Sequence, residues 1–266
     1  FTNMWFLAAA RLPLIIILII FTWPQNLPST GNIIGMMVAG ILWMLPFVLY
    51  YRAVEFEEPS RIALLLQMSN LFILPIAFFV IGERLAGTQL IAFFLLLTGG
   101  IMAGAKRLSG IWSVSKAFGL IALTSVGWSA SDVLFKKYAV AFESYHSALI
   151  IYLLGSFLPA LVALLFISIR RPLKKHLASI SSRGWVMVGI NLLVGIGGTI
   201  AFSYALTLGK ASLTSVFLGI QPLFAFSWGL LLKKLLHEVD SEDLSTQTLA
   251  LKGASLLLVI LGLSFL

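Results

Sequence analysis

Long apolar runs separated by short polar or charged breaks make up most of this chain. The run NIIGMMVAGILWMLPFVLYY (32–51) is typical, because about twenty mainly apolar residues let a helix cross a hydrocarbon layer of roughly 30 Å. The shorter alternating segments of a membrane β-barrel are absent from the sequence. The pattern predicts an all-α integral membrane protein with helices over residues 3–22, 32–53, 60–82, 87–105, 116–138, 144–169, 184–207, 211–233 and 247–266.

Composition and charge agree with a multi-pass membrane protein. Of the 266 residues, 60% are hydrophobic and 11% are charged, which does not suit a water-soluble globule. The formal net charge is +8, but the basic residues stand at the ends of apolar runs and form no single patch. We therefore expect the lipid bilayer as a partner, and no nucleic acid.

The chain contains an internal repeat. The segment AVEFEEPSRIALLLQMSNLF (53–72) aligns without a gap on ALTLGKASLTSVFLGIQPLF (205–224). The identical positions are Ala53, Ser60, Leu66, Leu71 and Phe72 in the first copy. The segment GTQLIAFFLLLTGG (87–100) is echoed by STQTLALKGASLLL (245–258), and each forms the last predicted helix of its half. The sequence therefore predicts two related repeats.

The boundaries of the repeats predict an inverted arrangement. A first repeat over 1–105 has four predicted helices, a linker covers 106–115, and a second repeat over 116–266 has five. The counterpart of helix 116–138 would precede Phe1, so we expect ten helices in the native protein, the first of them missing from this chain. Repeats of five helices cross a membrane in opposite senses, which gives the 5+5 inverted-repeat bundle found in many secondary transporters.

Loop charge gives an expectation for orientation. One set of loops carries most of the basic residues, including the run 170–175, whereas the other set carries only Arg84, Lys136, Lys137 and Lys210. The positive-inside rule then places the first set in the cytoplasm and the carboxyl terminus outside.

The repeats resemble a known family. The first copy, PSRIALLLQMSNLFILPIAFFVIGERL (59–85), and the second, KASLTSVFLGIQPLFAFSWGLLLKK (210–234), resemble the EamA repeat of the drug/metabolite transporter superfamily. The second copy has the central proline of that pattern at Pro222, where the first has Asn70, and it lacks the closing Gly-Glu. The resemblance implies a ten-helix carrier in a bacterial inner (plasma) membrane that exports amino acids or other small metabolites through a central cavity. It also implies that both termini are cytoplasmic, contrary to the loop charge.

Amide and hydroxyl groups interrupt the apolar helices and are the first candidates for a substrate-binding cavity. Gln67 and Asn70 are three residues apart and share a helix face, and Gln221 lies in the corresponding stretch of the second repeat. Polar groups at membrane depth normally face the interior of the bundle. The alternative is that they form hydrogen bonds between helices and only hold the bundle together.

The helix over 116–138 adds an aromatic residue, a hydroxyl and an acid. Trp128 and Ser129 could present a ring and a hydroxyl to a substrate. Asp132 is the only acid of this helix and is a candidate for a proton-linked group. The alternative is a pair with Lys136 one turn later.

Arg11 is the deepest cation that the sequence places in an apolar run. A buried guanidinium could bind a carboxylate or phosphate with two hydrogen bonds, or the side chain could extend to the membrane interface. Trp43 and Tyr204 are candidates for either the cavity or the aromatic belt. The glycines of the segment LLVGIGGTIAF (192–202) favour close helix packing over a hinge.

These features favour a secondary transporter that works by alternating access. A facilitative channel, or an exchanger of phosphorylated metabolites or nucleotide sugars, is the alternative, and an intramembrane enzyme is a weaker one because the sequence lacks catalytic motifs. No cysteine is present and the three histidines are dispersed, so no metal or cofactor is expected. The expected partner is a small-molecule substrate, and the protein is expected to be a monomer or homodimer.

Overall fold

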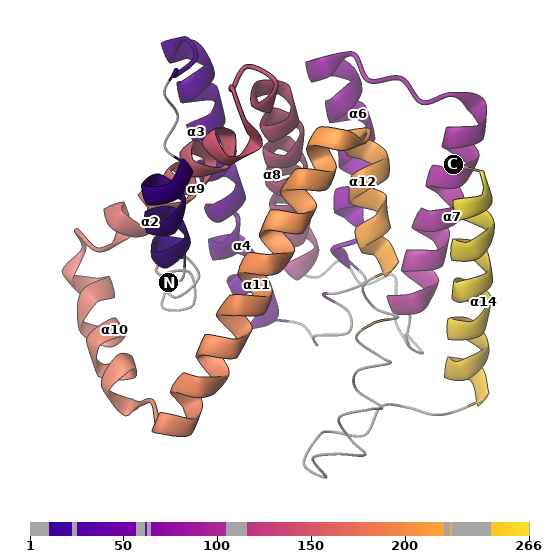
Figure 1. The fold of residues 1–266 in the computed structure, drawn as a ribbon. Helices are drawn as coiled ribbons and strands as arrows, with labels where there is room; N and C mark the ends of the chain where they lie inside the picture. The colour runs from indigo at the N-terminus through magenta and orange to yellow at the C-terminus, as the bar shows by residue number, and fades with distance from the viewer. Residues whose placement is uncertain are drawn as a thin grey trace. The chain divides into compact units, whose positions relative to one another are not determined.

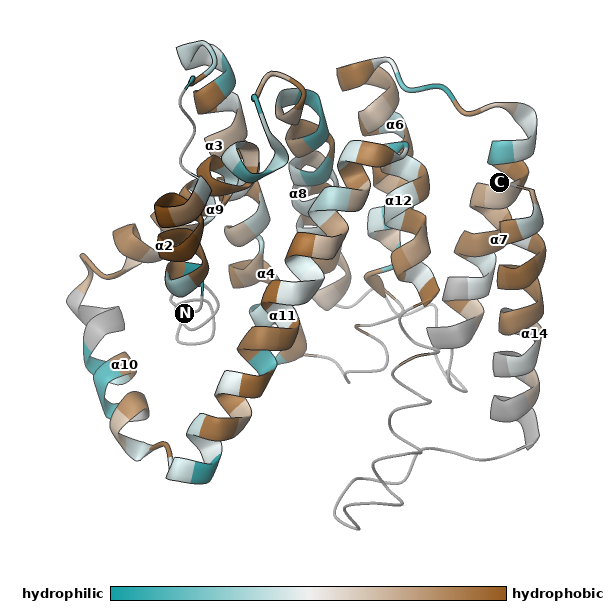
Figure 2. Ribbon diagram, in the orientation of Figure 1, coloured by the Kyte–Doolittle hydropathy of each residue, from teal (hydrophilic) through white to brown (hydrophobic). Residues whose placement is uncertain are grey.

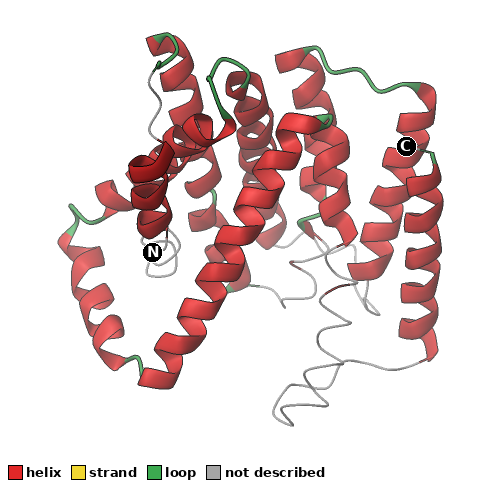
Figure 3. Cartoon of the chain, viewed as in Figure 1, coloured by secondary structure: helices red, strands yellow, loops and turns green. Residues whose placement is uncertain are grey.

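The structure is a computed structural model that describes residues 11–22, 26–56, 62, 65–104, 116–220, 224 and 246–265. Helices are the only regular elements in these residues (Figure 3). Four helical stretches are long and apolar enough to cross a membrane, and these are Thr30–Val54, Ala117–Ala139, Tyr145–Ala163 and Ser182–Leu208. The predicted all-helical class is therefore confirmed for the described part of the chain.

The helices follow one another along the chain as Figure 1 shows. They are α2 (Arg11–Thr22), α3 (Thr30–Met44), α4 (Phe47–Val54), α6 (Met68–Ile81), α7 (Gly87–Gly104), α8 (Lys116–Ala139), α9 (Tyr145–Ala163), α10 (Ile167–Ser179), α11 (Ser182–Leu208), α12 (Ala211–Phe217), the short 3-10 helix η1 (Leu218–Ile220) and α14 (Thr246–Ser264).

Four predicted helices match observed ones closely. The runs 87–105, 116–138, 184–207 and 247–266 correspond to α7, α8, α11 and α14. Polar or glycine-rich breaks border these runs within the chain, which is why those limits could be located from the sequence. The first ten residues and most of the stretch after Ile220, which includes Gln221, lie outside the described residues.

Other predicted helices are interrupted. The helix expected over 144–169 ends at Ala163, and the charged segment that follows forms α10, which was not predicted. Lysine, arginine and leucine favour helices, so the sequence IRRPLKKHLA continues as a separate polar helix. The run 32–53 is divided at Leu45 and Pro46, and the run 60–82 at Leu66 and Gln67. Proline lacks the N–H that a continuous helix needs, which explains the first division.

The chain divides into two compact units, and each is described separately. Unit 1 comprises Phe1–Leu49 and Gly127–Gly209, and unit 2 comprises Tyr50–Val126 and Lys210–Leu266. Each unit therefore contains segments from both sequence repeats.

Unit 1 is centred on the packing of α3 against α9. A Cβ added at Gly40 would collide with the backbone of Tyr152 and Ser156, and one added at Gly155 would collide with the backbone of Met37. Only glycine permits backbones to approach so closely. These two glycines thus bring α3 and α9 into direct contact.

In unit 2, α7 and α14 lie side by side (Figure 1). Their contact contains Leu96 and Val259, together with Val216 from α12. The Ser255 hydroxyl donates a hydrogen bond of 2.6 Å to the Gly99 carbonyl. Small side chains at such contacts allow helices to pack closely in an apolar environment.

Apolar side chains are also exposed in quantity, and several of them lie on α11. Figure 2 marks the hydrophobic residues of each helix in brown. Leu193 is 72% exposed, and Val186, Met187 and Ile190 are exposed on the same helix. Soluble proteins rarely expose apolar surface of this extent, whereas a lipid bilayer covers it. The exposed surface of α11 is therefore consistent with a membrane protein.

Candidate functional site

Arg11 lies inside unit 1 at the start of α2. Its side chain is only 5% exposed, and Nη1 donates a hydrogen bond of 2.7 Å to the Ser156 hydroxyl on α9. That hydroxyl donates in turn to the Leu153 carbonyl at 2.8 Å. The guanidinium is therefore buried within unit 1.

The indole of Trp43 covers one face of the Arg11 guanidinium. The guanidinium carbon lies 3.7 Å from the ring centroid, which is a close cation–π contact. Trp128 supports the arrangement, because its indole N–H donates to the Trp43 carbonyl at 3.0 Å and its ring packs against Phe47. Trp43 is therefore a wall of the site, and Trp128 helps to hold that wall in place.

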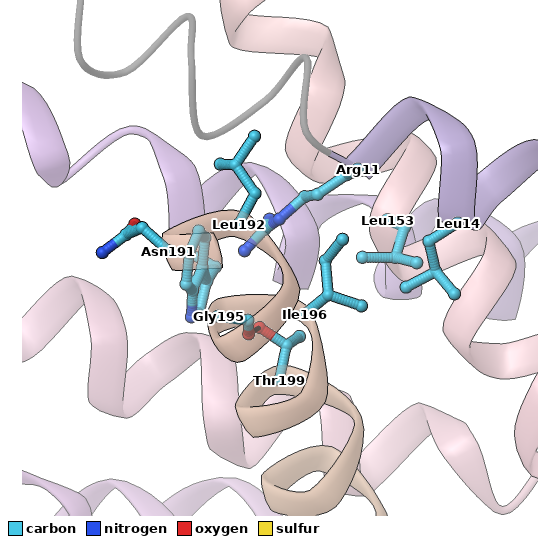
Figure 4. A pocket seen from close by; sticks show the side chains of 9 residues that line it. Arg11, Leu14, Leu153, Asn191, Leu192, Gly195, Ile196 and Thr199 are labelled. Carbon is cyan, nitrogen blue, oxygen red and sulfur yellow. Dashed lines mark hydrogen bonds between the residues drawn. The ribbon is translucent and has the colours of Figure 1, made fainter. Parts of the chain in front are cut away.

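A cavity of about 140 Å³ adjoins Arg11 and Trp43. Figure 4 shows the Arg11 side chain reaching from α2 toward the turn of α11 that carries Leu192 and Gly195. The remaining lining residues are Leu14, Leu153, Asn191, Ile196 and Thr199. The lining is thus mostly apolar with a few polar groups, as in pockets for small molecules.

Among the residues that the structure describes, Arg11 is the single ionisable one in the lining of this cavity. A guanidinium has five N–H donors, and within the described residues one hydrogen bond, to Ser156, and no acidic partner are found. A buried charge without a counter-ion is costly. The guanidinium can therefore bind an anionic group that enters the cavity. Ser156 and Trp43 already hold it in position, with the Trp43 ring covering one of its faces.

A second polar group in unit 1 surrounds Tyr152 on α9. The Ser131 hydroxyl donates to the Ala39 carbonyl at 2.8 Å and lies 3.4 Å from the Tyr152 hydroxyl. Ser156, which accepts the hydrogen bond from Arg11, lies one turn after Tyr152 on α9. The group therefore connects α8 to the Arg11 site through α9.

The alternative pair between Asp132 and Lys136 is not found among the contacts of the described residues. Asp132 is 9% exposed, and it has no hydrogen-bond or ion-pair partner among the residues that the structure describes. The Lys136 ammonium instead donates to the carbonyls of Leu206, at 3.2 Å, and of Gly209. Carbonyls at a helix end lack partners within the helix, so the end of α11 attracts this cation.

The glycines of α11 correct another expectation. Within the described part of the chain, a Cβ at Gly195, Gly197 or Gly198 would meet no neighbour within 4 Å, so no close helix packing is found at these residues. Gly195 lines the cavity instead. The close contacts occur at Gly40 and Gly155, which the sequence reasoning missed although both stand among apolar residues of predicted helices.

Gln67 and Asn70 lie in unit 2 and are both buried. Asn70 Nδ2 donates to Gln67 Oε1 at 2.9 Å, and the Ser215 hydroxyl of α12 donates to Asn70 Oδ1 at 3.3 Å. These contacts are of the kind that holds helices together. A cavity-lining role for the two amides stays a prediction.

The remaining candidates lie in different surroundings. Ser129 is buried on α8. Tyr204 on α11 is 49% exposed, and its ring centroid lies 5.1 Å from that of Tyr145. The Tyr145 hydroxyl is 2.7 Å from the Ser203 hydroxyl. Gln221 falls outside the described residues.

Comparison with known proteins bears on the fold and not on the function. No family model matches the sequence, and no curated protein matches it. The chain resembles 23 chains of known structure. One of them, known from a crystal structure, matches with a TM-score of 0.64 and 17% sequence identity, covering 99% of this chain and 84% of that one. The fold is therefore shared with solved structures, and membership of the EamA family stays a prediction.

Proposed function

We propose that this protein is a secondary transporter that moves a small carboxylate-bearing metabolite, such as an amino acid, across a membrane by alternating access. The observation that carries the proposal is the Arg11 guanidinium. It is buried, it is stacked on Trp43, and it adjoins a cavity in whose lining the described residues include no acid to neutralise it.

Helix length and surface support a membrane location. Four helical stretches can cross a bilayer by length and composition, and α11 exposes large apolar side chains such as Leu193. In a bilayer, a polar group at depth is expensive and is normally functional. A buried arginine beside a cavity is therefore better explained by a ligand than by stability. A bacterial inner membrane is the proposed location.

The chemistry of the cavity supports a carboxylate. The planar guanidinium matches a carboxylate with two parallel N–H···O bonds. A cavity of roughly 150 Å³ in another protein holds a molecule the size of benzene, so the volume of about 140 Å³ beside Arg11 suits a small metabolite. A phosphorylated sugar carries more negative charge than one arginine can neutralise, which disfavours the exchanger alternative.

Interrupted helices support alternating access. Pro75 lies inside α6, Pro159 lies inside α9, and Pro46 separates α3 from α4. Proline bends a helix and leaves carbonyls without partners, so these positions can bend further as a carrier opens at alternate ends. The inverted repeat expected from the sequence supports the same mechanism, because carriers with two inverted halves open alternately to the two sides of the membrane.

A counterflow assay with the full chain tests the proposal. Purified protein is placed in liposomes loaded with one unlabelled L-amino acid, and uptake of the same labelled amino acid is measured for each of the proteinogenic amino acids in turn. We expect the intact protein to exchange one chemically related group of amino acids, and we expect the Arg11→Leu variant to exchange none of them. Arg171→Leu is the matched control, because Arg171 is exposed on α10.

Three results would contradict the proposal. The first is an absence of exchange for every amino acid tested. The second is equal exchange by the intact protein and by Arg11→Leu, which would show that the guanidinium does not bind the substrate. The third is chemical alteration of a labelled amino acid, which would indicate an enzyme.

A further inference from the structure

We propose that the substrate of the Arg11 site is an amino acid with a short aliphatic side chain, and that Gly195 sets the upper limit of its size. This inference rests on the proposed transport function and adds the substrate class. It gives a role to a glycine of α11 at which no close helix packing is found.

Gly195 leaves an open position in the wall of the cavity. Among the described residues of the lining, it is the one without a side chain, and a Cβ added there would meet no neighbour within 4 Å. Gly40 and Gly155 differ from it, because a Cβ at either of them would collide with backbone atoms. The absence of a side chain at Gly195 therefore enlarges the cavity and does not bring two helices together.

The cavity meets one face of α11. The lining residues of this helix are Asn191, Leu192, Gly195, Ile196 and Thr199 (Figure 4). They are separated by one, three or four residues, and a helix brings such positions to one side. Gly195 lies in the middle of this set, so a side chain at this position would point toward the cavity.

Much of the surface around Gly195 is aliphatic. Leu192 and Ile196 of α11 line the cavity together with Leu14 of α2 and Leu153 of α9. Polar atoms of a substrate side chain would lie against these groups without hydrogen-bond partners, which is unfavourable. The lining therefore favours a substrate whose side chain is aliphatic.

The polar groups of the lining suit the charged end of an amino acid. The Arg11 guanidinium can bind the carboxylate. The Thr199 hydroxyl donates to the Gly195 carbonyl at 2.9 Å, so its oxygen can only accept a hydrogen bond from a ligand. Asn191, one turn before Gly195, has an amide oxygen that also accepts. An ammonium group has donors only, so these two oxygens are suitable partners for it.

The volume of the cavity limits the size of the substrate. It is about 140 Å³, close to the roughly 150 Å³ that holds benzene in another protein. A methyl group at position 195 would reduce this volume, and the largest accepted substrate would be affected first. One methylene more or less in an apolar pocket changes discrimination between substrates by roughly tenfold or more.

Competition in the counterflow assay tests both the class and the size limit. Liposomes containing the full chain exchange the labelled L-amino acid that is transported best, while unlabelled alanine, valine, leucine, phenylalanine or threonine competes. We expect valine to compete with the intact protein at least about tenfold better than threonine, which has nearly the same shape but carries a hydroxyl.

Two variants change the cavity in opposite directions. Gly195→Ala adds one methyl group, and it should weaken competition by the largest accepted amino acid by about tenfold or more, while competition by alanine stays nearly unchanged. Ile196→Val removes one methylene from the same face of α11, and it should improve competition by phenylalanine relative to alanine.

Gly197→Ala is the matched control. It makes the same glycine-to-alanine change on α11, at a position where a Cβ also meets no neighbour within 4 Å. Two residues along a helix lead to nearly the opposite face, and Gly197 is not among the described residues of the lining. Its size preference should equal that of the intact protein.

The outcomes separate this inference from the transport function. Absence of counterflow by the intact protein would overturn both. Counterflow that prefers threonine or charged amino acids would overturn the substrate class alone. An equal loss for every amino acid in Gly195→Ala, or the same shift of preference in Gly197→Ala, would overturn the role of Gly195. If Gly195→Ala does not fold, Ile196→Val decides, and an unchanged preference in that variant would overturn the size limit.

Discussion

Two buried charges in this protein, Glu83 in unit 2 and Arg11 in unit 1, have opposite surroundings. The Glu83 carboxylate accepts hydrogen bonds from the backbone N–H groups of Ala211, at 2.8 Å, and Ser212, at 3.0 Å, and from the Ser212 hydroxyl. The Arg11 guanidinium makes one hydrogen bond and adjoins a cavity. A buried charge such as Glu83, whose acceptors are all close to protein donors, stabilises the fold. A buried charge such as Arg11, which has further N–H donors beside a cavity, is available to bind a ligand.

The local sequence explains why Glu83 has so many partners. Gly82 ends α6 in the left-handed conformation (φ 67°), which glycine adopts readily, and Glu83 follows it at once. The first N–H groups of α12 lack acceptors within their own helix, and they donate to the Glu83 carboxylate instead. The neighbouring Lys210 ammonium donates to the Gln89 side chain at 2.6 Å. The Gly-Glu pair therefore joins the end of α6 to the start of α12.

The largest effect on stability is expected from Glu83→Ala. The change leaves two buried N–H groups and a hydroxyl without an acceptor, so the free energy of unfolding should fall by roughly 2–5 kcal/mol. Thermal unfolding in detergent measures it, with Glu83→Gln expected to lose less because it keeps one acceptor oxygen. An unchanged unfolding temperature for Glu83→Ala would show that the carboxylate is not structural.

A smaller effect, on function and not on stability, is expected from Arg11→Lys. The ammonium keeps the positive charge and loses both the planar fork and the contact of the guanidinium with Trp43. Amino-acid counterflow should show an apparent affinity about 10–30-fold weaker, corresponding to roughly 1.5–2 kcal/mol. The unfolding temperature should stay within the range of the Arg171→Lys control. Undiminished affinity would mean that charge alone suffices at this site.

A weaker effect of the same kind is expected from Trp43→Phe. A phenyl ring attracts a cation less strongly than an indole, so the apparent affinity should fall by about three- to tenfold, which is on the order of 1 kcal/mol. Trp185→Phe is the control, since Trp185 is partly exposed on α11. Equal affinities in the two variants would remove Trp43 from the binding site.

The smallest effect is expected from Asn70→Leu. Hydrogen bonds between helices in membrane proteins contribute about 0.6 kcal/mol on average, so the loss of stability should be of that size, with no change in which amino acids exchange. A double-mutant cycle with Ser215→Ala isolates the bond of 3.3 Å between the two side chains. A changed substrate preference would instead place Asn70 in a cavity and make it functional.

Sequence reasoning located the helices best where their ends carry a chemical signal. The limits of α7, α8, α11 and α14 follow from apolar runs with polar or glycine-rich breaks, which are local properties of the chain. The same reasoning failed for α10, because a charged segment was read as a loop although its residues favour helices. Arg11 could be identified as a candidate from the sequence, because a cation within an apolar run is energetically costly whichever helices surround it.

The order of residues shows that the chain consists of apolar helices and that Arg11, Asp132 and Asn70 are polar groups within them. The contacts of these three groups depend on how the helices pack in the folded protein. Ser156 lies 145 residues from Arg11, and Asn70 is as far from Ser215. Helices of a membrane protein are apolar on every side, so hydropathy does not indicate which face packs on a neighbour. In unit 1, packing at Gly40 and Gly155 decides which faces of α3 and α9 meet, and α9 carries the Ser156 that Arg11 contacts.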